Sequence, residues 1–291
     1  MITQQCIASR LLNHALISSL LLIALATKLH AADFDHRYQS YDQLLHEVVQ
    51  VSDNKKQTRV NYQQLAVKQD TLAAVLISFS QVGKKQYDSW SQDQKLSFLV
   101  NAYNGFTLKL IVDNWHEFKQ GDAQSIRDLG SLFTTPWEKK FFTLFDKKRS
   151  LDEIEHEMVR KWFKEPRIHA ALVCAAVSCP PLRNEAFIPE NLNQQLQSQM
   201  QLFLADNSRN EIRVNNGKGQ GSLSPIFKWY RGDFEKGDGG FHSLFEFLST
   251  YREALVKGDT DQQAQRGVIN SKKYPIMFKD YDWRLNDVEN F

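Results

Sequence analysis

The stretch from Ser91 to Asn114, SQDQKLSFLVNAYNGFTLKLIVDN, predicts a long helix that is buried over most of its surface. Its first four residues have the form of a capping box, in which Ser91 and Gln94 reciprocally satisfy backbone N–H groups of the first turn. Apolar residues then recur three and four positions apart on two faces. One stripe contains Leu96, Leu99, Tyr103 and Leu110, and the other contains Leu108, Ile111 and Trp115.

Two asparagines, Asn101 and Asn104, lie in line with the second stripe. A buried amide must find partners, because leaving one unpaired costs about 1–3 kcal/mol. Their side chains could hold the backbone of neighbouring loops. They could instead lie beside a pocket as hydrogen-bond donors, and the sequence leaves both interpretations open.

A second helix with a capping signal is predicted from Ser150 to Phe163. Glu155 falls on its apolar stripe, and His156 lies one step further round. A carboxylate on an apolar face either pairs with a cation or has a raised pKa. Arg167 or Arg183 could supply that cation, and Glu155 could alternatively act as a general acid or base.

The stretch Arg167–Ala175, RIHAALVCA, predicts a central strand covered on both faces, because it is a short and continuous apolar run. In a strand, His169 and Cys174 point to opposite faces and do not pair. Cys179 follows the strand, where the chain can turn back toward His169. A thiol with a base in reach and a lowered pKa is a candidate nucleophile.

A disulfide between Cys174 and Cys179 is the alternative. Five extended steps would separate their Cα atoms by about 16 Å, and a disulfide requires about 6 Å. A turn through residues 176–178 is therefore needed, and small residues followed by Pro180-Pro181 allow one. A disulfide, a functional thiol at Cys179 and two inert thiols all remain open.

The remaining pattern indicates an α+β fold, namely a helix-rich single domain packed on a small mixed or antiparallel sheet with a C-terminal hairpin. Helices outnumber strands and do not alternate with them. Further helices are predicted over Tyr41–Val51, Leu65–Val82, Asn191–Ala205 and Phe241–Leu255. The hairpin is predicted from Glu211–Val214 and Leu223–Tyr230, which flank Asn216-Gly217.

Residues 1–32 have the three zones of a cleavable signal peptide: a start with Arg10, an apolar run from Ala15 to Ala26, and small residues ending at Ala32. The run is shorter than the roughly 20 residues that span a bilayer, so no stable membrane span is expected after cleavage. A single globular domain is then expected over residues 33–291, in the periplasm or secreted.

Cleavage would leave a domain with no net charge. The chain has 36 basic and 34 acidic residues, and removal of Arg10 and Lys28 leaves 34 of each. A neutral domain argues against a nucleic-acid partner, which requires a basic face. Nucleotide, haem and zinc-protease motifs are absent from the sequence, so no cofactor and no metal is expected.

Several ordered motifs resemble one family. They are Asn101-Ala-Tyr-Asn104, Leu151–His156, Arg167–Arg183, Ser224–Tyr230 and Tyr281–Asn286. The sequence is similar to the domain-of-unknown-function 547 family over about Val60 to Asp287, and we expect an exported bacterial member. The resemblance implies that the chain shares the fold of this family, but it does not indicate a reaction.

Two functions from different classes are compatible with these residues. The first is a cysteine-dependent hydrolase or acyl transferase of the cell envelope, with Cys179 as nucleophile and His169 as base. Asn101 or Asn104 would orient the base or bind an oxyanion, and Glu155 and Arg183 would assist.

The second function is a non-catalytic module that binds a small-molecule or cell-envelope ligand, with the two cysteines in a structural disulfide. Its cleft would be lined by residues from several motifs: Tyr103, Asn104, His156, Arg183, Trp229 and Tyr230. A metal-dependent hydrolase using His156 and His169 is a weaker third hypothesis.

Protein expressed with its complete N-terminus in a bacterial host should begin at Ala32 or Asp33 after export, which intact mass spectrometry can read. Arginine in place of both Leu20 and Leu21 interrupts the apolar run and should leave the chain uncleaved. An exported protein that retains Met1 would contradict the signal-peptide prediction.

Overall fold

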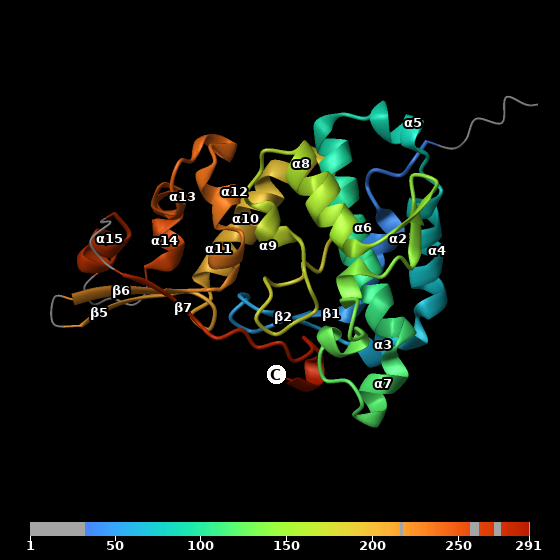
Figure 1. Cartoon of the computed structure of the whole chain (residues 1–291), viewed down its shortest axis with the longest axis horizontal. Coiled ribbons are helices and arrows are strands. Elements are labelled where there is room, and N and C mark those ends of the chain that lie inside the picture. The colour runs from blue at the N-terminus through green and yellow to red at the C-terminus, as the bar shows by residue number, and fades with distance from the viewer. Residues whose placement is uncertain (1–32, 216–217, 257–261, 271–274, 291) are drawn as a thin grey trace, which may run out of the picture. The chain divides into compact units, whose positions relative to one another are not determined.

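The computed structural model describes residues 33–215, 218–256, 262–270 and 275–290. The predicted signal peptide and the predicted turn at Asn216-Gly217 lie outside these residues. The chain divides into two compact units, Met1–Asp35 and His36–Phe291, and the second contains every element described below. Figure 1 labels the helices and strands.

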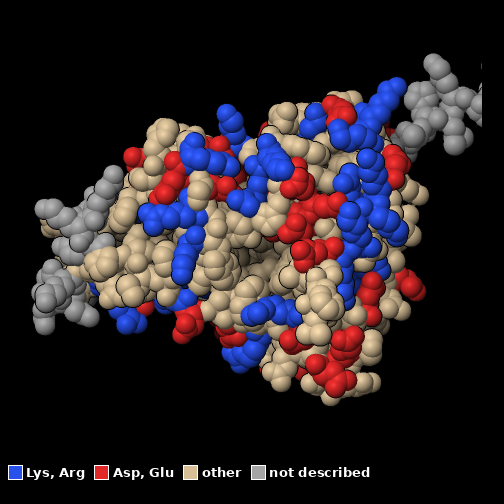
Figure 2. Space-filling view, viewed as in Figure 1, with Lys and Arg blue, Asp and Glu red and all other residues tan. Residues whose placement is uncertain are grey.

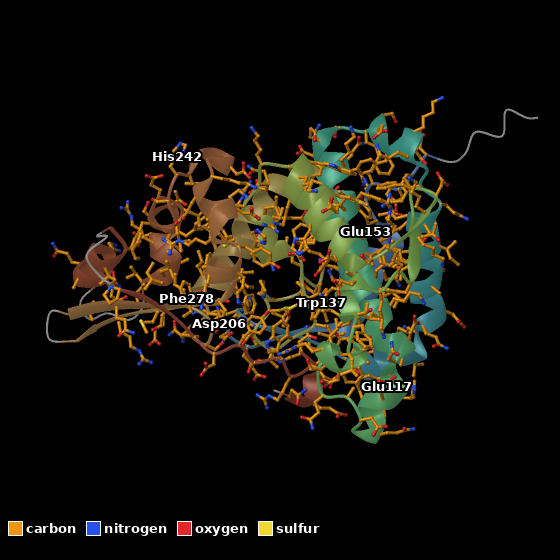
Figure 3. All side chains as sticks on the ribbon, in the orientation of Figure 1. Glu117, Trp137, Glu153, Asp206, His242 and Phe278 are labelled. Carbon is orange, nitrogen blue, oxygen red and sulfur yellow. A yellow bond between two sulfur atoms is a disulfide. The ribbon has the colours of Figure 1, made fainter. Side chains whose placement is uncertain are left out.

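Helix α6 (Gln92–Asp113) is the predicted long helix, and its capping box is confirmed. The backbone N–H of Gln94 donates to Ser91 Oγ at 3.2 Å, and that of Ser91 donates to Gln94 Oε1 at 2.9 Å. Both apolar stripes are buried within α6, because α4 (Gln69–Ser80) and the π-helix Glu153–Val159 both pack on it (Figure 1), whereas Trp115, beyond the end of α6, is only partly buried. Side chains fill the space between these helices (Figure 3).

The other helices of the N-terminal half are short and surround α6. They are α2 (Gln39–Val48), α3 (Tyr62–Val67), α5 (Lys84–Asp88), α7 (Trp115–Gln120) and α8 (Arg160–Trp162). The predicted capping of the second helix is confirmed, because Glu153 N donates to Ser150 Oγ and Ser150 N donates to Glu153 Oε2.

The C-terminal half has its own apolar core, in which Phe203, Phe227, Phe234 and Phe247 are fully buried. Helix α10 (Leu192–Ala205) is the predicted helix that contributes Phe203. The remaining helices are α9 (Ile168–Ala171), α11 (Ile226–Trp229), α12 (Arg231–Glu235), α13 (Leu244–Thr250), α14 (Arg252–Leu255) and α15 (Gln262–Asn270).

The strands form small sheets, which confirms the predicted α+β class. Two sheets are antiparallel pairs: β1 (Val49–Val51) with β2 (Thr58–Val60), and β3 (Phe142–Leu144) with β4 (Lys147–Arg149). The third is mixed, because the hairpin of β5 (Glu211–Asn215) and β6 (Lys218–Leu223) is joined by the parallel strand β7 (Ile276–Phe278).

The segment after β7 runs back across the domain and ties distant parts together. Leu285 and Asp287 form isolated β-bridges with Ala176 and Val60. The hydroxyl of Tyr62 donates to Asn286 Oδ1 at 2.9 Å across 224 positions of sequence.

The predicted strand over Arg167–Ala175 is wrong: its centre is the short helix α9. A short apolar run fits a buried helix as well as a buried strand, and the pair Ala170-Ala171 favours the helix. No sheet partner is needed, because the side chain of Asn104 accepts from Val173 N at 2.9 Å and donates to Ala171 O at 2.9 Å.

Other predicted boundaries also require correction. The predicted second hairpin strand over Leu223–Tyr230 is wrong: the strand is β6, which ends at Leu223, because Ser224-Pro225 starts α11 and proline cannot donate to a sheet. The helices predicted over Leu65–Val82 and Phe241–Leu255 are each broken into two. Tyr41–Val51 changes from helix to strand after Val48.

Both asparagines of α6 hold backbone, as one of the two sequence interpretations stated. Asn101 donates to Phe187 O at 2.8 Å and accepts from Phe187 N at 3.0 Å. Asn104 makes the equivalent pair with Ala171 and Val173. Each amide thus makes the two backbone hydrogen bonds that a neighbouring β-strand would otherwise make to a segment that follows α8.

Asn104→Ala should lower the free energy of unfolding by about 3 kcal/mol, because it leaves a buried N–H and a buried carbonyl without partners. Urea unfolding followed by circular dichroism measures the change. Asp113→Asn is the control on the same helix. It removes an exposed ion pair with Lys109 and should cost less than about 1 kcal/mol. Equal losses in the two variants would contradict this role of Asn104.

Candidate functional site

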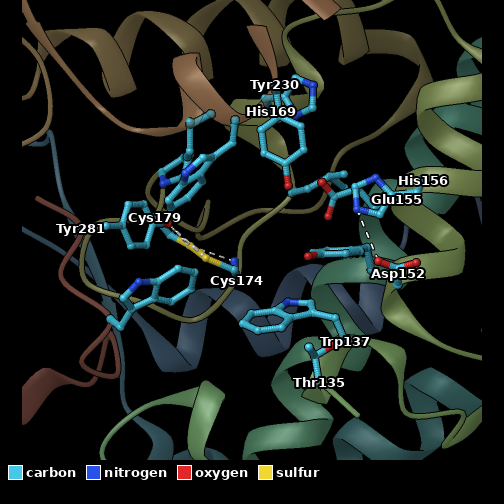
Figure 4. Close-up of a pocket in the computed structure, with 16 residues that line it drawn as sticks. Thr135, Trp137, Asp152, Glu155, His156, His169, Cys174, Cys179, Tyr230 and Tyr281 are labelled. Carbon is cyan, nitrogen blue, oxygen red and sulfur yellow. Dashed lines mark hydrogen bonds and ion pairs between the residues drawn. A yellow bond between two sulfur atoms is a disulfide. The ribbon is translucent and has the colours of Figure 1, made fainter. Parts of the chain in front are cut away.

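A cavity of about 250 Å³ lies where the two halves of the domain meet the segment after β7. We call this cavity the site pocket. Most of its lining side chains are aromatic, acidic, sulfur-containing or histidine side chains (Figure 4). The lining residues are Tyr103, Thr135, Trp137, Asp152, Glu155, His156, His169, Leu172, Cys174, Cys179, Pro180, Ile226, Trp229, Tyr230, Tyr281 and Trp283. Figure 2 shows a hollow near the centre of this face of the molecule.

The acidic wall of the site pocket comes from the π-helix and the residue before it. A π-helix has a wider turn than an α-helix and is frequent at functional sites. Here Arg160 N donates to Glu155 O, five residues earlier. Asp152, Glu155 and His156 are spaced three and four residues apart and line the same cavity. Burial raises the pKa of Asp152, and the charge of Glu155 raises it further.

Glu155 faces tyrosine hydroxyls. Figure 4 shows the Tyr230 hydroxyl pointing toward the Glu155 carboxylate. Burial raises the pKa of both Tyr103 and Tyr230, and the neighbouring Glu155 adds to both shifts.

Neither arginine suggested by the sequence pairs with Glu155. Arg167 forms its ion pair with Glu165 at 2.6 Å, and Arg183 forms one with Glu185.

Asp233, on α12, organises the histidine side of the site pocket. His169 Nε2 donates to Asp233 Oδ2 at 2.8 Å, and Arg160 Nε approaches the same oxygen at 2.5 Å. Arg160 also contacts His156 Nδ1 at 2.7 Å. The His169 ring stacks on Tyr230 with centroids 4.0 Å apart. The two histidines are thus held by one arginine–carboxylate pair.

The protonation states of this cluster follow from its burial and charges. Burial lowers the pKa of His169, and the hydrogen bond to Asp233 opposes this only in part. Burial would raise the pKa of Asp233, but hydrogen bonds from His169, Arg160 and Lys236 outweigh it and hold that pKa well below its usual range. A neutral His169 imidazole that donates to the ionised Asp233 carboxylate agrees with the lowered pKa of both groups. Arg160 supplies the positive charge beside the carboxylate.

Cys174 and Cys179 form a disulfide, with Cα atoms 6.1 Å apart. The disulfide requires a turn between the two cysteines. That turn is present, and in it Cys179 N donates to Ala176 O at 3.0 Å. A bonded sulfur is not a thiolate, so the predicted nucleophilic role of Cys179 does not apply to this state of the protein. The Tyr281 hydroxyl lies 3.2 Å from each sulfur.

Tryptophans form the opposite wall. Trp283 has Tyr281 at 4.5 Å, Trp229 at 5.9 Å and Trp137 at 6.0 Å between ring centroids. The guanidinium of Arg127 lies 5.2 Å from the Trp283 ring centroid. Trp229 is 49% exposed, so part of this aromatic wall is open to solvent.

The structure brings most of the predicted site residues together. Lining the pocket are Tyr103, Glu155, His156, His169, Cys174, Cys179, Trp229 and Tyr230. Asn101 and Asn104 lie outside the lining, because their amides hold loop backbone. Arg183 lies in a separate groove, where it bonds to Ser198 at 3.0 Å.

Several pocket residues were not singled out as site residues from the sequence. Tyr281 and Trp283 belong to a quoted family motif that could have suggested them. Asp152 also lies in a quoted motif, Leu151–His156, whereas Trp137 had no such signal, since only the folded chain brings it to the pocket. Asp233 lies behind the pocket as a positioning residue for His169.

Two further features are absent from the described part of the chain. It contains no group of three or more His, Cys, Asp or Glu side chains that could hold a metal ion. It also contains no helix that is both long and apolar enough to cross a membrane.

Comparison with known protein families gives a match over part of the chain. Residues 87–204 match the family described as "Protein of unknown function, DUF547", which is the family that the sequence motifs resemble. The match includes the acidic wall and the disulfide, whereas Trp229, Tyr230, Tyr281 and Trp283 follow it. No curated protein and no solved structure matches the chain.

His169 should make the folded state sensitive to mild acid. Its folded pKa lies below the unfolded value of about 6.5, so the unfolded chain binds more protons as the pH falls below that value. Stability from this residue is therefore complete above about pH 6.5 and is lost toward lower pH.

His169→Gln keeps a donor for Asp233 but does not titrate. The stability advantage of the wild type over this variant should shrink by about 1 kcal/mol between about pH 7.5 and 5.5. Urea unfolding at both pH values measures it. An advantage that is constant or grows in acid would contradict a neutral, buried His169.

Proposed function

We propose that this domain is a binding module for a small organic cation, an amine or quaternary ammonium group on a short carbon skeleton. The observation that carries the proposal is the combination of aromatic walls with the carboxylates of Asp152 and Glu155 around one cavity. Aromatic rings attract cations through their negative faces, and carboxylates add a full opposite charge.

The aromatic arrangement supports this ligand class. Rings from four separate parts of the chain surround the cavity, including Tyr103, Trp137, Tyr230 and Trp283. Such cages favour quaternary ammonium groups, because attraction to several ring faces offsets the hydration that the cation loses. The pocket also has hydroxyl groups on its tyrosines for a hydroxyl or amine of the ligand.

The charges around the pocket also favour a cation. Among its lining residues in the described chain, the fixed charges are those of Asp152 and Glu155, and neither lysine nor arginine is present. The nearby guanidinium of Arg160 is engaged by Asp233 and His156. A cationic ligand would therefore meet two carboxylates with no lysine or arginine in the lining, and His156 Nε2 lies 3.4 Å from Asp152 Oδ1.

The size of the cavity limits the ligand. Typical small-molecule sites enclose about 300–1,000 Å³, and this cavity of about 250 Å³ falls just below that range. A ligand of choline size or slightly larger is appropriate. Because Trp229 is half-exposed, a longer ligand could extend past it into solvent.

The alternative hypothesis of a cysteine-dependent hydrolase has weaker support. Cys179 is bonded to Cys174, and the amide of Asn101, which was to orient the base, is occupied by Phe187. We also propose that binding takes place outside the cytoplasm, in the periplasm or after secretion. That location is supported by the predicted signal peptide.

Tryptophan fluorescence or calorimetry with choline tests the proposal. The neutral isostere 3,3-dimethylbutan-1-ol has the same shape without the charge, and it should bind at least about tenfold more weakly. Glu155→Gln should weaken choline binding by about tenfold or more while leaving the isostere unaffected.

Glu157→Gln is the matched control. Glu157 lies on the same helix, is 56% exposed and pairs with Lys161 outside the pocket. This variant should bind choline as the wild type does. Equal affinity of the wild type for choline and its isostere would reject an organic cation as the ligand.

A further inference from the structure

The disulfide forms part of a ligand-accessible wall, with its two sulfurs in different surroundings. Both cysteines line the site pocket. Cys174 is half-buried, whereas Cys179 is 1% exposed. A small molecule in the cavity can therefore approach Cys174 Sγ more readily than Cys179 Sγ.

The backbone inside the disulfide loop is strained. Ala175 has a φ of 59°, a left-handed conformation that a residue with a Cβ atom rarely adopts. The segment after β7 holds it there, because Asn286 N donates to Ala175 O at 3.0 Å and Leu285 bridges to Ala176. Strain in a loop closed by a disulfide makes that bond easier to reduce.

Hydrogen-bond donors are already directed at Cys179 Sγ. The backbone N–H of Cys174 lies 3.0 Å from it, and the Tyr281 hydroxyl lies 3.2 Å from it and equally far from Cys174 Sγ. Burial raises the pKa of Tyr281, so this hydroxyl keeps its proton and can donate. Donors placed in this way would stabilise a thiolate at Cys179.

A buried cation lies behind the same loop. Arg209 donates to the carbonyl of Val177, between the two cysteines, at 2.7 Å. Arg209 also forms an ion pair with Asp206, which balances part of its positive charge. The loop therefore combines a strained residue, a partly accessible sulfur at Cys174 and a buried sulfur at Cys179 that faces hydrogen-bond donors.

We propose that Cys174–Cys179 is a redox-active disulfide that exchanges with small dithiols entering the site pocket. The thiolate of the dithiol attacks Cys174 Sγ and forms a mixed disulfide. The bond between Cys174 and Cys179 breaks, and its electron pair leaves on Cys179 as a thiolate.

The second thiol of the reductant completes the exchange. Once deprotonated, it attacks the reductant sulfur of the mixed disulfide, so the reductant becomes a cyclic disulfide and Cys174 leaves as a thiolate that takes up a proton. Overall, one dithiol is oxidised and one protein disulfide is reduced. This activity does not depend on which cation the pocket binds.

Folded protein should be reduced completely by millimolar dithiothreitol at neutral pH, with both thiols then alkylated by iodoacetamide and counted by mass spectrometry. Circular dichroism should show that the fold is retained. A disulfide that opens only together with unfolding in denaturant would overturn the proposal, because it would then be a purely structural bond.

Two alanines in the loop give a matched comparison. Ala175→Gly removes the strain that drives reduction, so the equilibrium constant with dithiothreitol should fall about tenfold. Ala176→Gly adds the same flexibility at a residue without a positive φ and should leave the constant nearly unchanged. Equal constants for the two variants would reject the strain at Ala175 as a driving force.

The leaving group is tested with Tyr281→Phe. In the reduced protein, loss of the hydroxyl should move the midpoint of Cys179 alkylation to higher pH, and reduction by dithiothreitol should slow at least about fivefold. An unchanged alkylation profile would overturn the assignment of Cys179 as the stabilised leaving thiolate.

Discussion

The side-chain amide of Asn104 makes the interaction on which the site depends most. It holds the carbonyl of Ala171 and the N–H of Val173, and so fixes the chain against α6 immediately before Cys174. These backbone groups have no neighbouring strand, and an unpaired buried group is costly. One amide on a rigid helix therefore sets where the disulfide and the adjoining pocket wall can lie.

A second constraint aligns the histidines with the acidic wall. Arg160 follows the π-helix and reaches both His156 and Asp233, while Asp233 also holds His169. Because the wide turn lies directly before Arg160, the same local feature positions the acidic wall and the guanidinium. The chemistry of the pocket thus depends on two elements, α6 and the π-helix, whose packing brings Tyr103 beside Glu155.

The sequence predicted those parts of the fold that local rules determine. Ser91 and Gln94 marked the start of α6, and its repeating apolar residues predicted burial correctly. Local rules failed at Arg167–Ala175, because the partner that decides its conformation, Asn104, lies more than sixty positions earlier. The pocket was predicted in part: polar residues on apolar faces identified Glu155 and His169, but Trp137 reaches the cavity only through tertiary packing.

The segment after β7 has a consequence for how the protein is made. Tyr281 and Trp283 contact residues that precede them by fifty to more than one hundred positions, and Asn286 bonds to Tyr62. Contacts between such distant positions form slowly, since a long loop must close before they contribute. During folding the helices around α6 can assemble first, and the pocket is completed only when this C-terminal segment docks. Completion of the pocket should therefore appear as a distinct, slow kinetic step after most helical structure has formed.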